Sequence, residues 1–163
     1  MMNELFEFVT HFPPWLATIL ISMVPVFELR VAIPLAIGVF KLSPWFAFLL
    51  AIIGDLVPAI AIVCFIKPVS IWLSARSKFI KKILDWWFLR TINNFEKKYI
   101  HYGAWALAIF VAIPLPVFGS WTGAVAAFLF GITKRRALFF ISLGTVVAAA
   151  IVTLVSVGAF SIF

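Results

Sequence analysis

Three ionisable residues lie deep inside apolar stretches of this sequence: Glu28, Arg30 and Asp55. Glu28 and Arg30 are two positions apart in the segment VPVFELRVAIP. A charge at the centre of a bilayer costs about 3 kcal/mol on insertion scales, so such residues usually have a specific role. An arginine can bind an anion through two parallel hydrogen bonds, and a buried carboxyl group can carry a proton. A structural ion pair is the alternative interpretation of Glu28 and Arg30.

The prolines near these charges predict how the chain presents them. Pro25 and Pro34 flank the pair, and the residue before a proline favours an extended conformation. An extended turn would place Glu28 and Arg30 on one side of the chain, with the carbonyl groups of Ile21 and Arg30 left free. Asp55 is three residues before Pro58, which predicts a kink. We expect Asp55 either to take part in transport or to be a structural partner of Arg30.

The composition is that of a membrane protein. The chain has 163 residues, of which 65% are hydrophobic and 12% are charged, and its mean hydropathy is +1.18. A soluble domain is about half apolar and a quarter charged. We expect a single membrane domain over residues 1–163, without a signal peptide, because the first eleven residues contain no lysine or arginine.

The charge distribution predicts the orientation. Eight basic residues lie between positions 67 and 98, and three more form the run at 134–136. Residues 44–66 and 137–163 are simple candidates for membrane spans, whereas prolines interrupt residues 12–40 and 104–132. If the two interrupted stretches are re-entrant hairpins, eleven basic residues lie in the cytoplasm and one, Lys41, lies outside. The positive-inside rule favours that topology over four simple crossings, with both termini outside.

The two halves share an organisation. Pro25-Val26-Phe27 recurs as Pro116-Val117-Phe118, and a glycine follows each proline after a similar interval, at Gly54 and Gly144. The expected fold is therefore an all-α integral membrane protein with two inverted repeats, residues 12–66 and 104–163. Each repeat consists of a proline-broken re-entrant hairpin and a transmembrane helix. Residues 67–103 are expected to form a cytoplasmic amphipathic helical linker on the inner leaflet.

The second hairpin contributes polar groups but no charge. Its segment AIPLPVFGSWTGA contains glycines that allow close backbone approach, and tight helix packing is the alternative role for them. Together with the first hairpin it supplies the residues that we expect to bind substrate: Arg30, Glu28, Pro25, Pro34, Pro114, Pro116, Gly119, Ser120, Trp121 and Thr122. Glu28 and Asp55 are the expected carriers of a coupling proton.

The motifs ELRVAIPL and AIPLPVFGSWTGA resemble those of the small multidrug export family, and the paired hairpins are similar to the larger DedA superfamily. The sequence departs from the family pattern at Val31 and at Val117-Phe118, where smaller residues are expected. The family resemblance implies efflux. The DedA resemblance implies the movement of lipid phosphates such as undecaprenyl phosphate across the bilayer with proton coupling.

These observations favour a transporter of an amphipathic substrate. A lipid-phosphate carrier is our first hypothesis, and a cation/proton antiporter that exports drugs is the second. A lipid-modifying membrane enzyme and a non-catalytic assembly factor are the alternatives from other classes. We expect no enzyme activity, cofactor, metal or nucleic-acid partner. The expected partners are membrane lipids, the substrate, protons and further copies of the chain. The expected location is a bacterial or archaeal inner membrane, crossed more than once.

Overall fold

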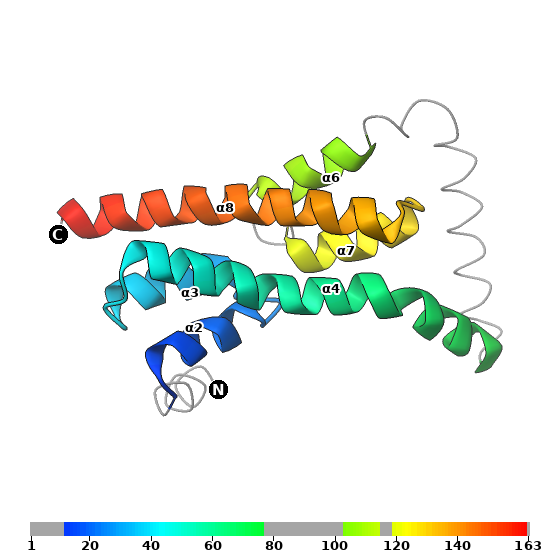
Figure 1. The fold of residues 1–163 in the computed structure, drawn as a ribbon, viewed down its shortest axis with the longest axis horizontal. Helices are drawn as coiled ribbons and strands as arrows, with labels where there is room; N and C mark the ends of the chain where they lie inside the picture. Colours follow the sequence, from blue (N-terminus) through cyan, green and yellow to red (C-terminus); the bar gives the residue numbers. More distant parts are fainter. Residues whose placement is uncertain (1–11, 77–102, 115–118, 163) are drawn as a thin grey trace.

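The computed structural model describes residues 12–76, 103–114 and 119–162, which form six α-helices and no strand (Figure 1). The helices are α2 (Pro14–Ser22), α3 (Glu28–Gly38), α4 (Pro44–Arg76), α6 (Gly103–Ala112), α7 (Ser120–Leu129) and α8 (Lys134–Ile162). The all-helical class that the sequence predicts is confirmed for these residues. Most of the expected linker, residues 77–102, lies outside the described residues, as do Pro116, Val117 and Phe118.

Two helices, α4 and α8, are long and apolar enough to cross a bilayer, over Pro44–Trp72 and Lys134–Ser161. They pack against each other and run in opposite directions (Figure 1). Helix α4 begins with a proline, whose missing N–H is not needed in a first turn. The helix then continues through Pro58 and Pro68 to Arg76. It therefore includes the first ten residues of the segment expected to be linker, residues 67–76.

The four short helices lie in two pairs along these long helices. Helices α2 and α3 are joined by a turn over residues 23–27 and pack against α4, and α3 also contacts α8. Helices α6 and α7 pack against α8, and α7 also contacts α4. In Figure 1 the α2–α3 pair lies along the first half of α4, and the α6–α7 pair lies along the first half of α8.

One glycine in each long helix allows close approach of a short helix. A Cβ atom at Gly54 would lie 2.5 Å from the carbonyl oxygen of Ile19 in α2. A Cβ atom at Gly144 would lie 2.6 Å from the carbonyl oxygen of Ala108 in α6. Because only a residue without a side chain fits at these distances, glycine is required at both crossings.

The buried apolar residues form two clusters, one for each pair of short helices. The first is made by Ala17, Ile21, Leu29, Ala32, Ile33, Ala51, Ala148 and Ala149. The second is made by Ala59, Val63, Leu107, Val111, Ala124, Ala127, Ala137 and Ile141. Along both α4 and α8 a stretch of several residues separates the two clusters, and this stretch contains Asp55 and Thr145.

Candidate functional site

A layer of buried polar groups lies between the two apolar clusters. Asp55 in α4, Ser120 at the start of α7 and Thr145 in α8 are each no more than 1% exposed. The Ser120 hydroxyl donates a hydrogen bond to the backbone carbonyl of Asp55 at 3.2 Å. The Thr145 hydroxyl donates to Asp55 Oδ2 at 3.5 Å. Helices α4, α7 and α8 thus meet at a single buried residue, Asp55.

The second oxygen of that carboxyl group, Asp55 Oδ1, is buried and has no hydrogen-bond partner among the described residues. A buried polar atom without a partner is costly, so native proteins rarely keep one without a reason. Asp55 is also within electrostatic range of Glu28 and Arg30. The unpaired oxygen therefore marks a position where a proton or a cation would bind.

Glu28 and Arg30 form an ion pair, with 3.2 Å between Glu28 Oε2 and Arg30 Nη2. The Glu28 side chain is almost fully buried, whereas the Arg30 side chain is 20% exposed. The expected extended turn is wrong, because both residues lie in the first turn of helix α3. They can meet although they are two positions apart because Glu28 has a φ of 48°, which takes it out of regular helix geometry. A non-glycine residue in that region is strained.

The two pairs of short helices meet at Glu28. A Cβ atom added to Gly119 would overlap the carboxylate oxygens of Glu28. Gly119 precedes the first residue of α7, and its N–H donates a hydrogen bond to the Thr122 hydroxyl at 3.0 Å. The start of α7 is therefore held by its own residues directly against the carboxylate of the other pair. The structure thus brings Gly119, Ser120 and Thr122 together at the start of α7, beside Glu28 and Asp55. That they bind substrate stays a prediction.

The prolines of the expected site lie in different structural settings. Pro25 lies in the α2–α3 turn and is exposed, and Pro34 lies inside α3. The expected free carbonyl of Ile21 is not observed, because it accepts a hydrogen bond from the Val24 N–H at 3.1 Å. Pro114 follows the end of α6 and is partly buried.

Among the described carboxylates, Arg30 forms its ion pair with Glu28 and not with Asp55.

Trp121 adds a second polar atom without a partner. Its indole Nε1 is buried, and no described residue accepts a hydrogen bond from it. An indole N–H usually finds an acceptor when it is buried. Among the described residues, Asp55 Oδ1 and Trp121 Nε1 are thus an acceptor and a donor that are buried without a hydrogen-bond partner.

The chemistry available is that of binding and proton transfer. The cluster holds two carboxyl groups, one guanidinium group and the hydroxyls of Ser120 and Thr145. Within the described ranges no group of three or more His, Cys, Asp or Glu residues is placed to hold a metal ion. Carboxyl groups buried in this way can carry a proton or bind a cation.

Thr145 is the site residue that the sequence did not predict. A threonine in an apolar helix usually bonds to a carbonyl of its own helix, as Thr153 does to Ala149 in this chain. The signal that could have identified Thr145 is its position: it follows Gly144 as Asp55 follows Gly54 in the other half of the chain.

Comparison with known proteins identifies the family. Residues 28–151 match the family described as "Putative small multi-drug export protein". The match begins at Glu28 and covers most of the chain. No curated protein and no solved structure matches the sequence. The matched segment contains Arg30, Asp55, Ser120 and Thr145, together with most of both long apolar helices. The chain is therefore a membrane protein that belongs to the small multidrug export family.

Proposed function

We propose that the protein exports amphipathic organic cations in exchange for protons, with Asp55 and Glu28 as the exchanging groups. The observation that carries this proposal is the buried Asp55 carboxyl group, which has one oxygen without a partner. A proton in one state and a substrate cation in the other would satisfy it. The family description supports export of small molecules.

The charge of the cluster favours a cation over an anion. When both carboxyl groups are ionised, Glu28 and Asp55 outweigh the single positive charge of Arg30. Arg30 is also engaged by Glu28, so an anionic head group would have to displace that carboxylate first. The sequence alone favours a lipid phosphate, whereas the ion pair supports a cation as the substrate.

We further propose that α2–α3 and α6–α7 are re-entrant hairpins in two inverted repeats. The matched glycine contacts at Ile19 and Ala108 support the repeat. The helix directions in Figure 1 support the inversion, because α4 and α8 run in opposite directions, each with a short pair along its first half. Rocking of one repeat against the other would then expose the cluster alternately to the two sides, with an apolar cluster closing each path.

The proposed orientation places the end of α4 and the start of α8 in the cytoplasm. Lys67, Arg76 and the basic run at 134–136 lie there, whereas Lys41 lies between α3 and α4 at the other end.

The expected homo-oligomer also stays a proposal. It is supported by the α2–α3 turn, where Val26 is 82% exposed and would need a cover at mid-membrane depth. A monomer mass in both detergent and nanodiscs would contradict it.

Transport in proteoliposomes tests the function. Purified protein is reconstituted with a quaternary ammonium dye, and a pH gradient is imposed. We expect the wild type to move the dye against its concentration gradient and Asp55→Asn to lose this pH-driven movement while its melting temperature stays close to that of the wild type. Ser156→Ala is the matched control, because that buried hydroxyl donates to the Val152 carbonyl of its own helix. Full coupling in Asp55→Asn would refute the proposal.

A lipid-phosphate carrier is the second candidate. It is favoured because the Arg30 side chain is 20% exposed and can therefore be reached by an anionic head group. It predicts salt-sensitive binding of a polyprenyl phosphate that is lost in Arg30→Gln. Lysine would rescue poorly, because it lacks the planar fork of the guanidinium group. The same protein would then show no pH-driven movement of the dye.

A further inference from the structure

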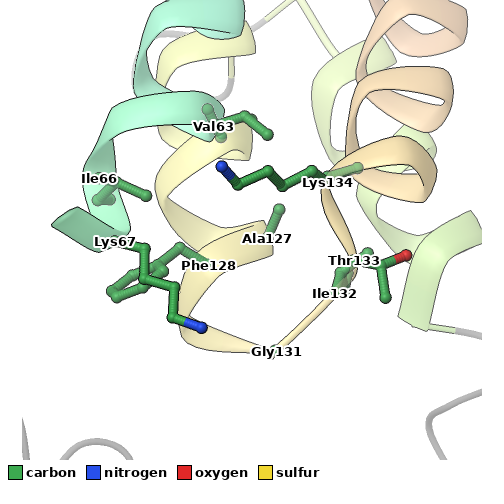
Figure 2. A pocket seen from close by; sticks show the side chains of 11 residues that line it. Val63, Ile66, Lys67, Ala127, Phe128, Gly131, Ile132, Thr133 and Lys134 are labelled. Atoms are coloured by element: carbon green, nitrogen blue, oxygen red, sulfur yellow. The ribbon is translucent and has the colours of Figure 1, made fainter.

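A cavity of about 420 Å³ lies where α4, α7 and the start of α8 meet, away from the Asp55 cluster (Figure 2). Its inner wall is made of buried apolar residues, among them Val63, Ala124 and Ala127. Its mouth is made of exposed residues that include Lys67, Thr133 and Lys134. Among the described residues, no aspartate or glutamate lines it. The cavity is therefore apolar inside and positively charged at its opening.

The two lysines are held at this mouth by local structure. Lys134 is the first residue of α8, and its side chain reaches across to α4, as Figure 2 shows. Its ammonium group donates a hydrogen bond to the Cys64 carbonyl at 3.0 Å. That carbonyl is available because Pro68, four residues later, has no N–H to donate. An ammonium group has three donors, so two remain for a ligand.

Lys67 faces the same opening from α4, and its ammonium group makes no ion pair with the described residues. Lys67 is the first charged residue after the apolar run of α4, and Lys134 begins the basic run at 134–136 that leads into the apolar run of α8. Both ammonium groups therefore lie where hydrocarbon gives way to lipid head groups.

At the corresponding corner at the other end of the molecule, α3 and the end of α8 meet, and the ring of Phe160 packs directly against Gly38. Among the described residues, an aromatic side chain therefore occupies that corner, whereas the corner beside Lys67 and Lys134 is open.

We propose that this cavity binds an anionic lipid, with the phosphate of the head group on Lys67 and Lys134 and an acyl chain along the apolar wall. Charge complementarity selects the anionic head group, and the buried inner wall accommodates the chain. The site is separate from the Asp55 cluster, so this proposal does not depend on which substrate the protein exports.

Binding to the purified, delipidated protein tests this site. Native mass spectrometry and thermal shift are measured with phosphatidylglycerol, with phosphatidylcholine, and with inorganic phosphate. We expect retention of phosphatidylglycerol, and an affinity about fivefold lower in Lys67→Gln, as expected for one basic group at a head group. Lys67→Gln breaks no described side-chain contact, so the variant should fold. Lys134→Gln should weaken binding as well, with an added loss of stability from the Cys64 contact.

Arg135→Gln is the matched control, since Arg135 is exposed next to Lys134 but does not line the cavity. It should bind phosphatidylglycerol like the wild type, and so should Asp55→Asn. An equal loss in Arg135→Gln would overturn the proposal in favour of diffuse surface attraction. Equal retention of phosphatidylcholine would overturn it because the lysines would then select nothing. A thermal shift with inorganic phosphate as large as that with the lipid would also overturn it, because the apolar wall would then contribute nothing.

Discussion

The Cα atom of Gly119 lies directly against the carboxylate of Glu28, so that a side chain of any size at position 119 would overlap it. This contact joins the start of α7 to the start of α3, and thus the two halves of the chain. The same carboxylate binds Arg30 at 3.2 Å. Any displacement of one half against the other must therefore change the surroundings of a buried charge.

Gly119→Ala should impair function more than stability. The overlapping atoms are the end of a flexible side chain, so Glu28 can shift at a modest cost, but the geometry of its contact with Arg30 must then change. We expect a loss of unfolding free energy of about 1 kcal/mol, near the lower limit for adding a methyl group to a packed site. We expect pH-driven transport to fall at least tenfold. Normal transport in a stable Gly119→Ala protein would show that this contact is not part of the mechanism.

Gly54→Ala and Gly144→Ala should show the opposite balance. Their added methyl groups would meet the backbone carbonyls of Ile19 and Ala108, which cannot rotate away. We expect each change to lower the unfolding free energy by about 1–3 kcal/mol. Gly158→Ala is the control, because nothing lies within 4 Å of its added Cβ atom in α8. It should be neutral or should stabilise the helix by up to about 1 kcal/mol. Equal effects of all three would contradict the packing argument.

The sequence predicted the elements better than it predicted their contacts. The apolar runs at 44–66 and 137–163 located both long helices. The end of α4 was missed because the basic linker was expected from Lys67 on, whereas the helix continues through Pro68. The Lys134 side chain compensates at the carbonyl that this proline leaves free. Such a compensation comes from a residue 70 positions away and cannot be read from local spacing.

The candidate site was likewise predicted in part. Charged residues in apolar stretches identified Glu28, Arg30 and Asp55, because their burial needs a reason. The sequence did not show that Glu28 adopts a positive φ, since that conformation is imposed by the turn before it. Nor did it show the cavity beside Lys67, which depends on how three helices pack.

Thr145→Val should reveal the link between α4 and α8. The change keeps the shape of the side chain but removes the described hydroxyl that donates to Asp55 Oδ2. Because both oxygens would then lack a described donor, we expect a loss of about 1–2 kcal/mol in unfolding free energy. Thr153→Val is the matched control in the same helix, since its hydroxyl donates to the Ala149 carbonyl of that helix, and it should change stability by less than about 0.5 kcal/mol. The loss should disappear when Thr145→Val is made in an Asp55→Ala background. A loss that persists there would mean that Thr145 acts through packing.

Single-cysteine labelling in a Cys64→Ala background should establish the orientation. Reporter cysteines at positions 76 and 135 should react from one side of the membrane, and those at 41 and 161 from the other. The reason is the position of these residues at opposite ends of α4 and α8 (Figure 1). Reaction of positions 41 and 135 from the same side would eliminate the inverted-repeat topology, whatever the protein transports.

The last prediction concerns the Glu28–Arg30 pair, for which a structural and a functional role lead to different results. Arg30→Gln leaves a carboxylate that is 7% exposed without its partner, whereas Glu28→Gln leaves a guanidinium group that is 20% exposed. Because removal of one member of a buried pair costs about 3–5 kcal/mol, and solvent contact reduces that cost, Arg30→Gln should be the less stable single variant. The double variant should regain stability, since no buried charge is left alone. If the pair only holds the hairpin, the double variant should also recover transport. We expect instead that it folds and melts like the wild type but shows no pH-driven transport, because Glu28 then has no exchangeable proton. Melting temperature and dye transport, measured together on the wild type and the three variants, separate the two roles.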